Sequence, residues 1–255
     1  FVGFLMDGIL LLEKQKETDH YQIQSLPINS GVFCLKKDRF QDVVWIGTDG
    51  QGVYLYSNPL YSIKSMVLSN YTEKIERPVR AIYLDDERTF WVGTKGNGIL
   101  KIYDYEFDKN ISDCRAEVLT TSNSALSSNA VYCFAKSHRN LLWIGDEEGL
   151  TYYSYREKRI KSIPIRIGNE DFKYIHGIYE TADSELWLAS VGMGVVKARI
   201  AGTPDNPVIV DAQRYIINDG ELGSNYFFTI YAENEANLLF GNKGYGVFPV
   251  SYTHL

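Results

Sequence analysis

One stretch decides the fold: Leu141-Leu142-Trp143-Ile144-Gly145-Asp146-Glu147-Glu148-Gly149-Leu150-Thr151-Tyr152-Tyr153. It combines a strand-forming run that contains Trp-Ile-Gly, a short acidic turn closed by glycine, and a second run rich in tyrosine. Two β-prone runs joined by a few glycine-containing residues indicate an antiparallel hairpin. The stretch therefore predicts two paired strands within residues 141–153.

The same hairpin occurs six times along the chain. Its copies are marked by Phe1, Trp45, Trp91, Trp143, Trp187 and Leu239, which are separated by 44, 46, 52, 44 and 52 residues. Self-similarity at a nearly fixed period of this length is typical of repeat architectures. We therefore interpret the rest of the chain relative to this repeat.

A further strand precedes five of the hairpins, and each has a small residue near its middle. These small residues are Cys34, Ala81, Cys133, Gly177 and Thr229. A position that is always small indicates closely packed backbones, so we expect these strands to be innermost. We expect Trp45, Trp91 and Trp143 to be buried between adjacent sheets. Weaker outer strands are predicted around 21–25, 62–68, 116–119, 160–163 and 213–217, and return loops at 69–78, 120–129 and 218–225.

Four strands per repeat and a period of 44–52 residues predict an all-β fold, a β-propeller of four-stranded antiparallel blades. We expect one domain over residues 1–255 with five to six blades: partial blades at 1–30 and 225–255, and blades at about 31–76, 77–127, 128–172 and 173–224. A β-sandwich would not repeat one hairpin at blade spacing. We expect the chain to be a fragment of a longer protein, the parent, and a truncated part of a seven-bladed ring.

Composition narrows the classes of function. The 255 residues are 45% hydrophobic and 23% charged, as in an ordinary globular chain. A net charge of −6 argues against a nucleic-acid partner, because phosphate binding needs clustered lysine and arginine. The sequence has no run of 18 apolar residues, so we expect no membrane segment within it.

The third complete repeat carries a specific motif. It contains Leu126-Ser127-Ser128-Asn129-Ala130-Val131, then Leu142-Trp143-Ile144-Gly145, then Gly149-Leu150 and Tyr153. This pattern resembles the two-component regulator propeller repeat, and parts of it recur at Trp45-Ile46-Gly47-Thr48, Trp91-Val92-Gly93-Thr94 and Leu222-Gly223-Ser224-Asn225. Departures from the pattern are Ala189-Ser190 and Leu239-Phe240.

The resemblance implies a function that composition and spacing do not. It implies that the parent is a bacterial hybrid two-component sensor of the inner membrane, with a histidine kinase elsewhere in its chain. Such a parent is expected to form a homodimer. This propeller would then lie in the periplasm, beside further blades and domains of the parent, and would respond to oligosaccharides.

No catalytic motif, metal-ligand spacing or cofactor motif is present, so we expect a fragment that is not an enzyme and holds no metal or cofactor. The acidic clusters Asp85-Asp86-Glu87 and Asp146-Glu147-Glu148 are predicted to lie in exposed turns rather than to form a glycosidase pair. Cys34, Cys114 and Cys133 are odd in number and are expected to be small buried side chains without a redox role.

Two polar residues interrupt the otherwise apolar innermost strands. Arg80 and His176 hold the position that is aromatic elsewhere, at Phe33, Tyr132 and Phe228. They are either polar side chains satisfied by the backbone or polar contacts in an aromatic ligand pocket. In a propeller the return loops and the central hairpin turns share one face. Here that face would carry Asp49, Lys95, Asn97, Asp146, Lys243 and Tyr245. The candidate ligand-binding residues are Arg80, Lys95, Asn97, Tyr132, His176 and Tyr245.

Three functions remain open from the residues and the resemblance. The first is an oligosaccharide-sensing module in which these residues contact the ligand. The second is a structural or protein-interaction propeller without its own small-molecule site. The third is a propeller lyase or glycosidase, which would need histidine, arginine and carboxylates to converge on the channel.

Overall fold

The structure, a computed structural model, describes residues 1–4, 8–15, 20–57, 62–66, 77–105, 114–217, 223–234 and 237–251. All regular elements in these residues are β-strands. Residues 67–68 of the predicted outer strand, residues 69–76 of the predicted loop 69–78 and residues 218–222 of the predicted loop 218–225 lie outside the described residues. The chain forms two compact units, Phe1–Leu119 and Thr120–Leu255, which are described separately.

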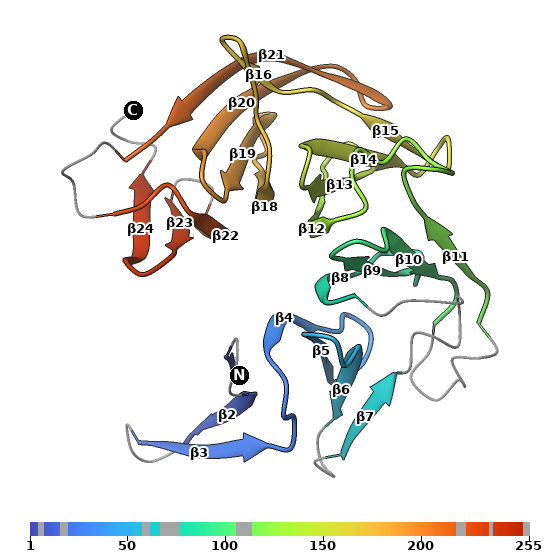
Figure 1. The fold of residues 1–255 in the computed structure, drawn as a ribbon, viewed down its shortest axis with the longest axis vertical. Coiled ribbons are helices and arrows are strands. Elements are labelled where there is room, and N and C mark those ends of the chain that lie inside the picture. The colour runs from blue at the N-terminus through green and yellow to red at the C-terminus, as the bar shows by residue number, and fades with distance from the viewer. Residues whose placement is uncertain are drawn as a thin grey trace. The chain divides into compact units, whose positions relative to one another are not determined.

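The first unit contains three antiparallel sheets (Figure 1). The first sheet has three strands, β1 (Val2–Gly3), β2 (Ile9–Lys14) and β3 (Tyr21–Leu26). The second consists of β4 (Val32–Lys37), β5 (Val43–Thr48), β6 (Val53–Ser57) and β7 (Ser62–Met66). The third consists of β8 (Val79–Leu84), β9 (Phe90–Thr94), β10 (Ile99–Ile102) and β11 (Ala116–Leu119).

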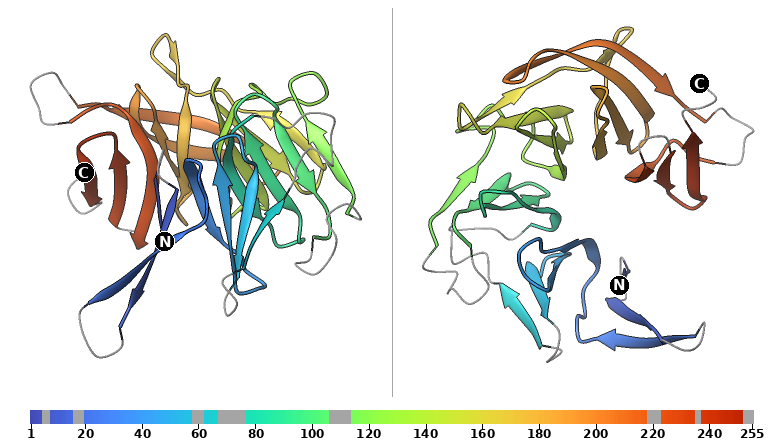
Figure 2. Two further views of the ribbon diagram at one scale, coloured as in Figure 1. Left: turned by 60° about the horizontal axis from the view of Figure 1, so that its bottom comes forward. Right: turned by 180° about the vertical axis from the view of Figure 1, so that it is seen from behind.

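The second unit contains three larger sheets and one small hairpin (Figure 2). Its first sheet consists of β12 (Val131–Lys136), β13 (Leu141–Asp146), β14 (Leu150–Ser154) and β15 (Arg159–Ser162). A hairpin of β16 (Arg166–Ile167) and β17 (Glu170–Asp171) follows. The next sheet consists of β18 (Ile175–Glu180), β19 (Glu185–Ser190), β20 (Gly194–Thr203) and β21 (Asn206–Tyr215), and the last of β22 (Phe227–Asn234), β23 (Asn237–Asn242) and β24 (Gly246–Ser251).

The strands with the small residues are innermost, as predicted. Each lies at one edge of its sheet and beside its counterpart in the next sheet of the same unit: β4 beside β8, and β12 beside β18 beside β22. Glycines after the tryptophans make this packing possible. A Cβ on Gly145 would lie 2.5 Å from Cys133 Sγ and 2.7 Å from the carbonyl oxygen of Ile175.

In one repeat the glycine lies on the innermost strand and the larger small residue lies on its partner strand, the reverse of the arrangement at Cys133 and Gly145. There the innermost strand carries Gly177, and the partner strand carries Ala189 in place of glycine. A Cβ on Gly177 would lie 3.2 Å from the Ala189 methyl group. The departure of Ala189 from the sequence pattern is therefore compensated across the strand pair.

The tryptophans Trp45, Trp91, Trp143 and Trp187 are buried, which confirms the prediction made for the first three. The Trp45 ring packs against two rings from the next sheet of its unit, with centroid distances of 4.1 Å to Phe90 and 5.0 Å to Tyr105. Each large ring therefore fills the space between successive sheets, where its burial stabilises the fold.

Buried carboxylates accept hydrogen bonds from three of the indoles. Trp45 Nε1 donates to Asp38 and Trp91 Nε1 donates to Asp85, both over 2.9 Å, and each acid belongs to the same sheet as its tryptophan. Trp143 Nε1 instead donates over 2.6 Å to Glu180 of the following sheet. The prediction that the Asp85 cluster lies in an exposed turn is thus wrong for Asp85, since its carboxylate also accepts the backbone N–H groups of Glu87 and Thr89.

The outer part of the second unit also differs from prediction. The outer strand expected at 213–217 is β21, which begins earlier, at Asn206, and pairs along its length with the equally long β20. The β16–β17 hairpin was not predicted, and β16 packs beside β21 (Figure 1). Pairing beyond the repeat length is a tertiary feature that strand periodicity in one segment does not reveal. No helix in the described part of the chain has the length and apolar character needed to cross a membrane.

Candidate functional site

A β-bulge recurs at the start of the innermost strand in five sheets. In β12, Val131 pairs with Asp146 and Cys133 with Gly145, so Tyr132 is the extra residue. The extra residues in the five sheets are Phe33, Arg80, Tyr132, His176 and Phe228, which we call the bulge row. A bulge breaks the regular alternation of a strand and redirects a side chain, often next to a functional site. The bulge row contains three of the six predicted site residues.

Members of the bulge row contact one another within each unit. In the first unit the Arg80 guanidinium lies 3.6 Å from the centroid of the Phe33 ring. In the second unit His176 stacks on Tyr132 with centroids 4.0 Å apart and meets the edge of Phe228 at 5.3 Å. The two polar residues therefore lie against aromatic rings, as predicted, and all five side chains remain at least partly exposed.

The second unit gathers hairpin turns and loop ends at one end of its sheets. This loop face consists of the turns 147–149, 191–193 and 243–245 and the loop ends 127–130, 171–174 and 224–226. Glu147 N donates to the carbonyl of Ala130, Val191 N to that of Tyr174, and Lys243 N to that of Tyr226, with N···O distances of 3.0–3.1 Å. The same backbone bond therefore fixes the loop face in each of three successive sheets.

The asparagine of the resembled motif fixes the preceding loop. Asn129 Oδ1 accepts the backbone N–H of Thr121 over 2.9 Å, and Asn225 Oδ1 accepts that of Ile217 over 2.7 Å. Asn225 Nδ2 also donates to the carbonyl of Ile217 over 3.1 Å. These side chains join residues eight positions apart in the sequence and hold the loop ends before β12 and β22.

The remaining predicted residues lie in turns. Lys95 and Asn97 share the β9–β10 turn of the first unit, where Asn97 Oδ1 accepts the N–H of Arg77 over 3.2 Å. Tyr245 is exposed in the β23–β24 turn of the loop face. The structure thus brings Tyr132 together with His176, and Lys95 together with Asn97. A role of these six residues in ligand binding stays a prediction.

Asp146 is buried, although its cluster was predicted to be exposed. Its carboxylate accepts Ser127 Oγ over 2.6 Å and the backbone N–H groups of Glu148 and Gly149 over 2.9 and 3.0 Å. Burial raises the pKa of Asp146 to about 6, although these hydrogen bonds lower it. Asp146 occupies the repeat position of Thr48 and Thr94, whose hydroxyls hydrogen-bond within the hairpin turn. At this position the turn in the third complete repeat therefore has a titratable carboxyl group in place of a hydroxyl.

A pocket of about 240 Å³ opens between the β13–β14 turn and the loop that follows β15. Glu148 and Lys173 line it and form an ion pair across 2.5 Å. Its other lining residues are Ser127, Gly149, Leu150, Ser162, Ile163, Pro164, Ile165, Asp171 and Phe172. The lining combines polar and apolar groups, which is what small-molecule sites require. A second pocket, of about 220 Å³, is lined almost wholly by apolar and aromatic residues around Trp187.

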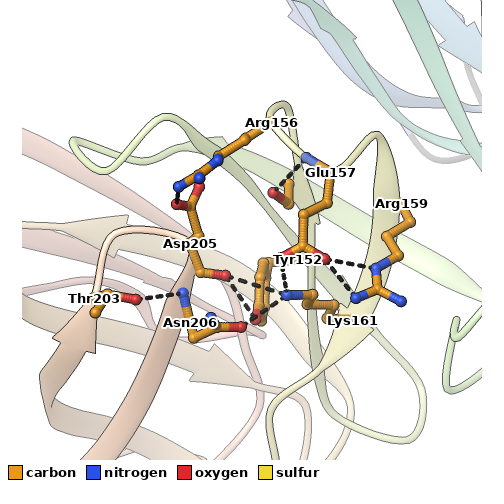
Figure 3. A network of polar contacts seen from close by, with 9 residues as sticks. Tyr152, Arg156, Glu157, Arg159, Lys161, Thr203, Asp205 and Asn206 are labelled. Atoms are coloured by element: carbon orange, nitrogen blue, oxygen red, sulfur yellow. Dashed lines mark hydrogen bonds and ion pairs between the residues drawn. The ribbon is translucent and has the colours of Figure 1, made fainter.

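A polar network lies at the opposite end of the strands of this unit (Figure 3). It joins the β14–β15 turn to the tip of the β20–β21 hairpin: Arg156 pairs with Asp205 over 2.5 Å, and Lys161 donates to Asn206 Oδ1 over 2.8 Å. Glu157 pairs with both Lys161 and Arg159, and hydrogen bonds from Lys161 and Arg159 lower the pKa of its carboxyl. Every charged side chain in the network has an ion-pair partner, so we assign this network to holding the long hairpin in place.

The cysteines are free thiols. The Cys34 sulfur faces Gly47, and burial raises the pKa of this thiol to about 12. The pKa of Cys133 is raised for the same reason, and its sulfur lies 3.5 Å from the carbonyl oxygen of Ile175. Within the described ranges, no group of three or more histidine, cysteine, aspartate or glutamate residues could hold a metal ion.

Two aromatic residues of the loop face were missed in the sequence. Tyr174 and Tyr226 each directly precede an innermost strand, at the position of Gly31, Pro78 and Ala130 in the other repeats. Both are exposed. Alignment of the repeats one residue further upstream would have found this change from small to aromatic residues.

Comparison with known proteins establishes the fold. No protein-family model matches the chain. The β-propeller domain of Cps50 (Swd1) from Myceliophteria thermophila is 12% identical, with a TM-score of 0.65 over 98% of this chain and 78% of that one. PorZ, a surface component of the type-IX secretion system of Porphyromonas gingivalis, is 14% identical, with a TM-score of 0.64 over 88% of this chain and 32% of that one. The chain therefore has the β-propeller fold, and it spans about a third of PorZ.

Three further proteins are similar to the chain. Virginiamycin B lyase of Staphylococcus aureus is 14% identical, with a TM-score of 0.61 over 95% of this chain and 77% of that one. The extracellular domain of BT4673, a putative hybrid two-component system of B. thetaiotaomicron, is 20% identical, with a TM-score of 0.41 over 91% of this chain and 30% of that one. Translation initiation factor 6 of Saccharolobus solfataricus is 31% identical over 140 residues, which are 50% of this chain and 57% of that protein. The chain thus spans little more than half of this curated relative.

Proposed function

We propose that this propeller is a ligand-sensing module in the periplasmic part of a hybrid two-component sensor, and that its ligand is an oligosaccharide. The observation that carries the proposal is the bulge row, which places one redirected side chain at the same point of five sheets. Four of these side chains are aromatic or imidazole rings, and the fifth, Arg80, lies against a ring. The motif resemblance supports the sensor context.

The chemistry of the row suits recognition of a sugar. Aromatic faces pack against the apolar face of a sugar ring. Arg80 in the first unit, and separately His176 and the Tyr132 hydroxyl in the second, can exchange hydrogen bonds with sugar hydroxyls. Asn97 and Tyr245 add an amide and a phenol near the turns of their units. Because a hydroxyl exchanges good water contacts for protein contacts of similar strength, we expect affinities in the micromolar range or weaker.

Binding rather than catalysis is proposed because the titratable groups near this row have structural partners. Asp146 is enclosed by Ser127 and two backbone N–H groups, and the His176 ring lies between two aromatic rings. A lyase or glycosidase needs such groups aimed at a shared substrate position. The kinase activity of the proposed sensor would reside elsewhere in the parent.

A second candidate function is protein interaction, and a specific feature favours it. The β22–β24 sheet exposes Tyr231 and Val247, which are 64% and 61% accessible. Exposed apolar side chains on this sheet suit contact with another blade or domain of the parent, or with a second parent chain in a homodimer.

The test is calorimetry of the full chain with a panel of plant and host oligosaccharides, repeated for Arg80→Ala and His176→Ala. Binding of at least one oligosaccharide, weakened about tenfold or more by one of these changes, is the expected result. Glu185→Ala, a change in a surface ion pair, should leave binding unchanged. Failure of the wild-type chain to bind any member of the panel would reject sensing by this propeller and favour the interaction role.

A further inference from the structure

We propose that Tyr174 and Tyr226 form a two-ring platform on the loop face that stacks against separate rings of a neutral oligosaccharide. This inference rests on the proposed function and assigns it a site outside the bulge row. The two residues are equivalent by repeat, because each directly precedes an innermost strand, β18 or β22. Their side chains are exposed, at 42% for Tyr174 and 45% for Tyr226.

Backbone contacts through one residue set the distance between the tyrosines. Val191 N donates to the carbonyl of Tyr174 over 3.1 Å, and Val191 forms an isolated antiparallel bridge with Tyr226. Two neighbouring strand spacings separate their Cα atoms by roughly 10 Å. A single monosaccharide ring is too small to cover both tyrosines, whereas an extended chain of several sugars can contact both.

The backbone at Tyr174 is held in a conformation that tyrosine disfavours. Its φ is +54°, in the left-handed region, whereas Gly31, Pro78, Ala130 and Tyr226 at the same repeat position do not have positive φ. The repeat therefore does not require this conformation. Tyr174 N donates to the carbonyl of Glu147 over 3.0 Å, and the Tyr174 carbonyl accepts Val191 N in the bond that recurs at Ala130 and Tyr226. Strain of this kind in a bulky residue accompanies functional sites.

Tyr226 is also held in place before any ligand binds. Asn225 immediately precedes it, is tied to Ile217 by two hydrogen bonds, and accepts the N–H groups of Gly192 and Gly194 at its carbonyl over 2.9 and 3.1 Å. Pre-organised aromatic residues contribute contact area at a low entropic cost. Both rings of the platform thus project from backbones that neighbouring turns fix.

Charges around the platform favour an uncharged ligand. Glu148 pairs with Lys173, next to Tyr174, and Glu147 adds a second carboxylate on this side. Lys243 lies 5.6 Å from the centroid of the Tyr226 ring on the other side. These four residues carry two positive and two negative charges, so the surface lacks the excess of lysine and arginine that an acidic glycan or a nucleic acid requires. The pocket lined by Phe172 and Lys173 adjoins Tyr174 along the chain and can accept a sugar substituent.

The experiment measures binding of neutral gluco-, xylo-, manno- and arabino-oligosaccharides, each as a disaccharide and a hexasaccharide, by calorimetry on the full chain. We expect hexasaccharides to bind at least tenfold more tightly than disaccharides. Tyr174→Ala or Tyr226→Ala should each reduce hexasaccharide affinity on the order of tenfold and remove most of this length dependence. Tyr174→Phe keeps the ring and should bind within about twofold of wild type. The control Tyr231→Ala removes a more exposed tyrosine outside the loop face and should have no effect.

Tyr174→Gly separates a binding role from a structural one. Glycine accepts the left-handed conformation without strain, so this variant should melt at a higher temperature than wild type while it loses affinity. If wild type binds hexasaccharides and the two alanine variants bind equally well, the platform is refuted and the proposed function stands with another site. If wild type binds nothing in this neutral panel, the platform and neutral-sugar sensing both fail.

Discussion

Glu180→Ala should destabilise the second unit strongly, because Glu180 links two sheets through buried polar groups. Its carboxylate is 4% exposed, accepts the Trp143 indole over 2.6 Å and lies 3.6 Å from Arg139 Nε. Removing one member of such a buried pair costs about 3–5 kcal/mol. Arg139 keeps a hydrogen bond to Ser184 over 2.8 Å, so we expect the lower end, about 3 kcal/mol. In a chain of this length that corresponds to a fall of roughly 6–12 °C in melting temperature.

Urea and thermal unfolding, followed by circular dichroism and tryptophan fluorescence, measure this effect. Glu180→Gln retains an acceptor for the indole and should lose less stability than Glu180→Ala. The matched control is Glu185→Ala, which removes a partly exposed ion pair with Lys197 (2.9 Å) and should cost less than about 1 kcal/mol. If Glu180→Ala and Glu185→Ala unfold at the same urea concentration, the buried linkage between the sheets contributes nothing and the reasoning is refuted.

Three further predictions concern the strand pairs and the turns. Gly47→Ala should cost about 1–3 kcal/mol, because a Cβ there would lie 2.5 Å from Cys34 Sγ and 3.0 Å from Val79 Cγ1. Cys34→Gly in the same chain removes the closer contact and should restore part of the urea midpoint; a midpoint that does not recover would refute the exchange of small residues between the paired strands. Asp85→Ala should cost about 2 kcal/mol, because it leaves the Trp91 indole and two backbone N–H groups without their acceptor. The adjacent change Asp86→Ala removes only an exposed ion pair and should cost less than about 1 kcal/mol. Equal melting temperatures of the two variants would contradict this prediction. Burial raises the pKa of Asp146 from 3.8 to about 6, so its contribution to stability is complete below pH 4 and is lost as pH rises through 6. The free energies of unfolding of wild type and Asp146→Asn, measured by urea titration, should therefore diverge over this range by up to roughly 3 kcal/mol. Parallel curves would refute this prediction.

Much of the fold was predictable because the repeat constrains it several times over. Each tryptophan position, each small residue and each glycine turn occurs in several copies, so an error in one copy is corrected by the others. The innermost strands and the buried tryptophans followed from this redundancy. The same alignment placed Arg80 and His176 among aromatic residues, where the structure has them.

The features that were missed depend on contacts between distant residues. A bulge adds one residue to a strand, and a single strand read by itself shows no irregularity. Asp85 and Asp146 stand in turn-forming sequences that are usually hydrated, and they become buried because an indole, a serine hydroxyl and backbone N–H groups surround them. The tyrosine at position 174 can be found in the repeat alignment one residue further upstream, whereas its left-handed backbone is seen only in the structure.

The two ways of pairing a tryptophan with an acid have a consequence for how repeats can be exchanged during evolution. Trp45 bonds to Asp38 and Trp91 to Asp85, so in each case donor and acceptor lie within one sheet. Such a sheet carries both partners of this hydrogen bond when it is moved or copied. Where Trp143 bonds to Glu180, the acceptor comes from the following sheet, so neither sheet can be excised or duplicated without exposing an unmatched partner. Gene-level shuffling should therefore tolerate insertion beside the first kind of sheet and should inherit the second kind as an inseparable pair.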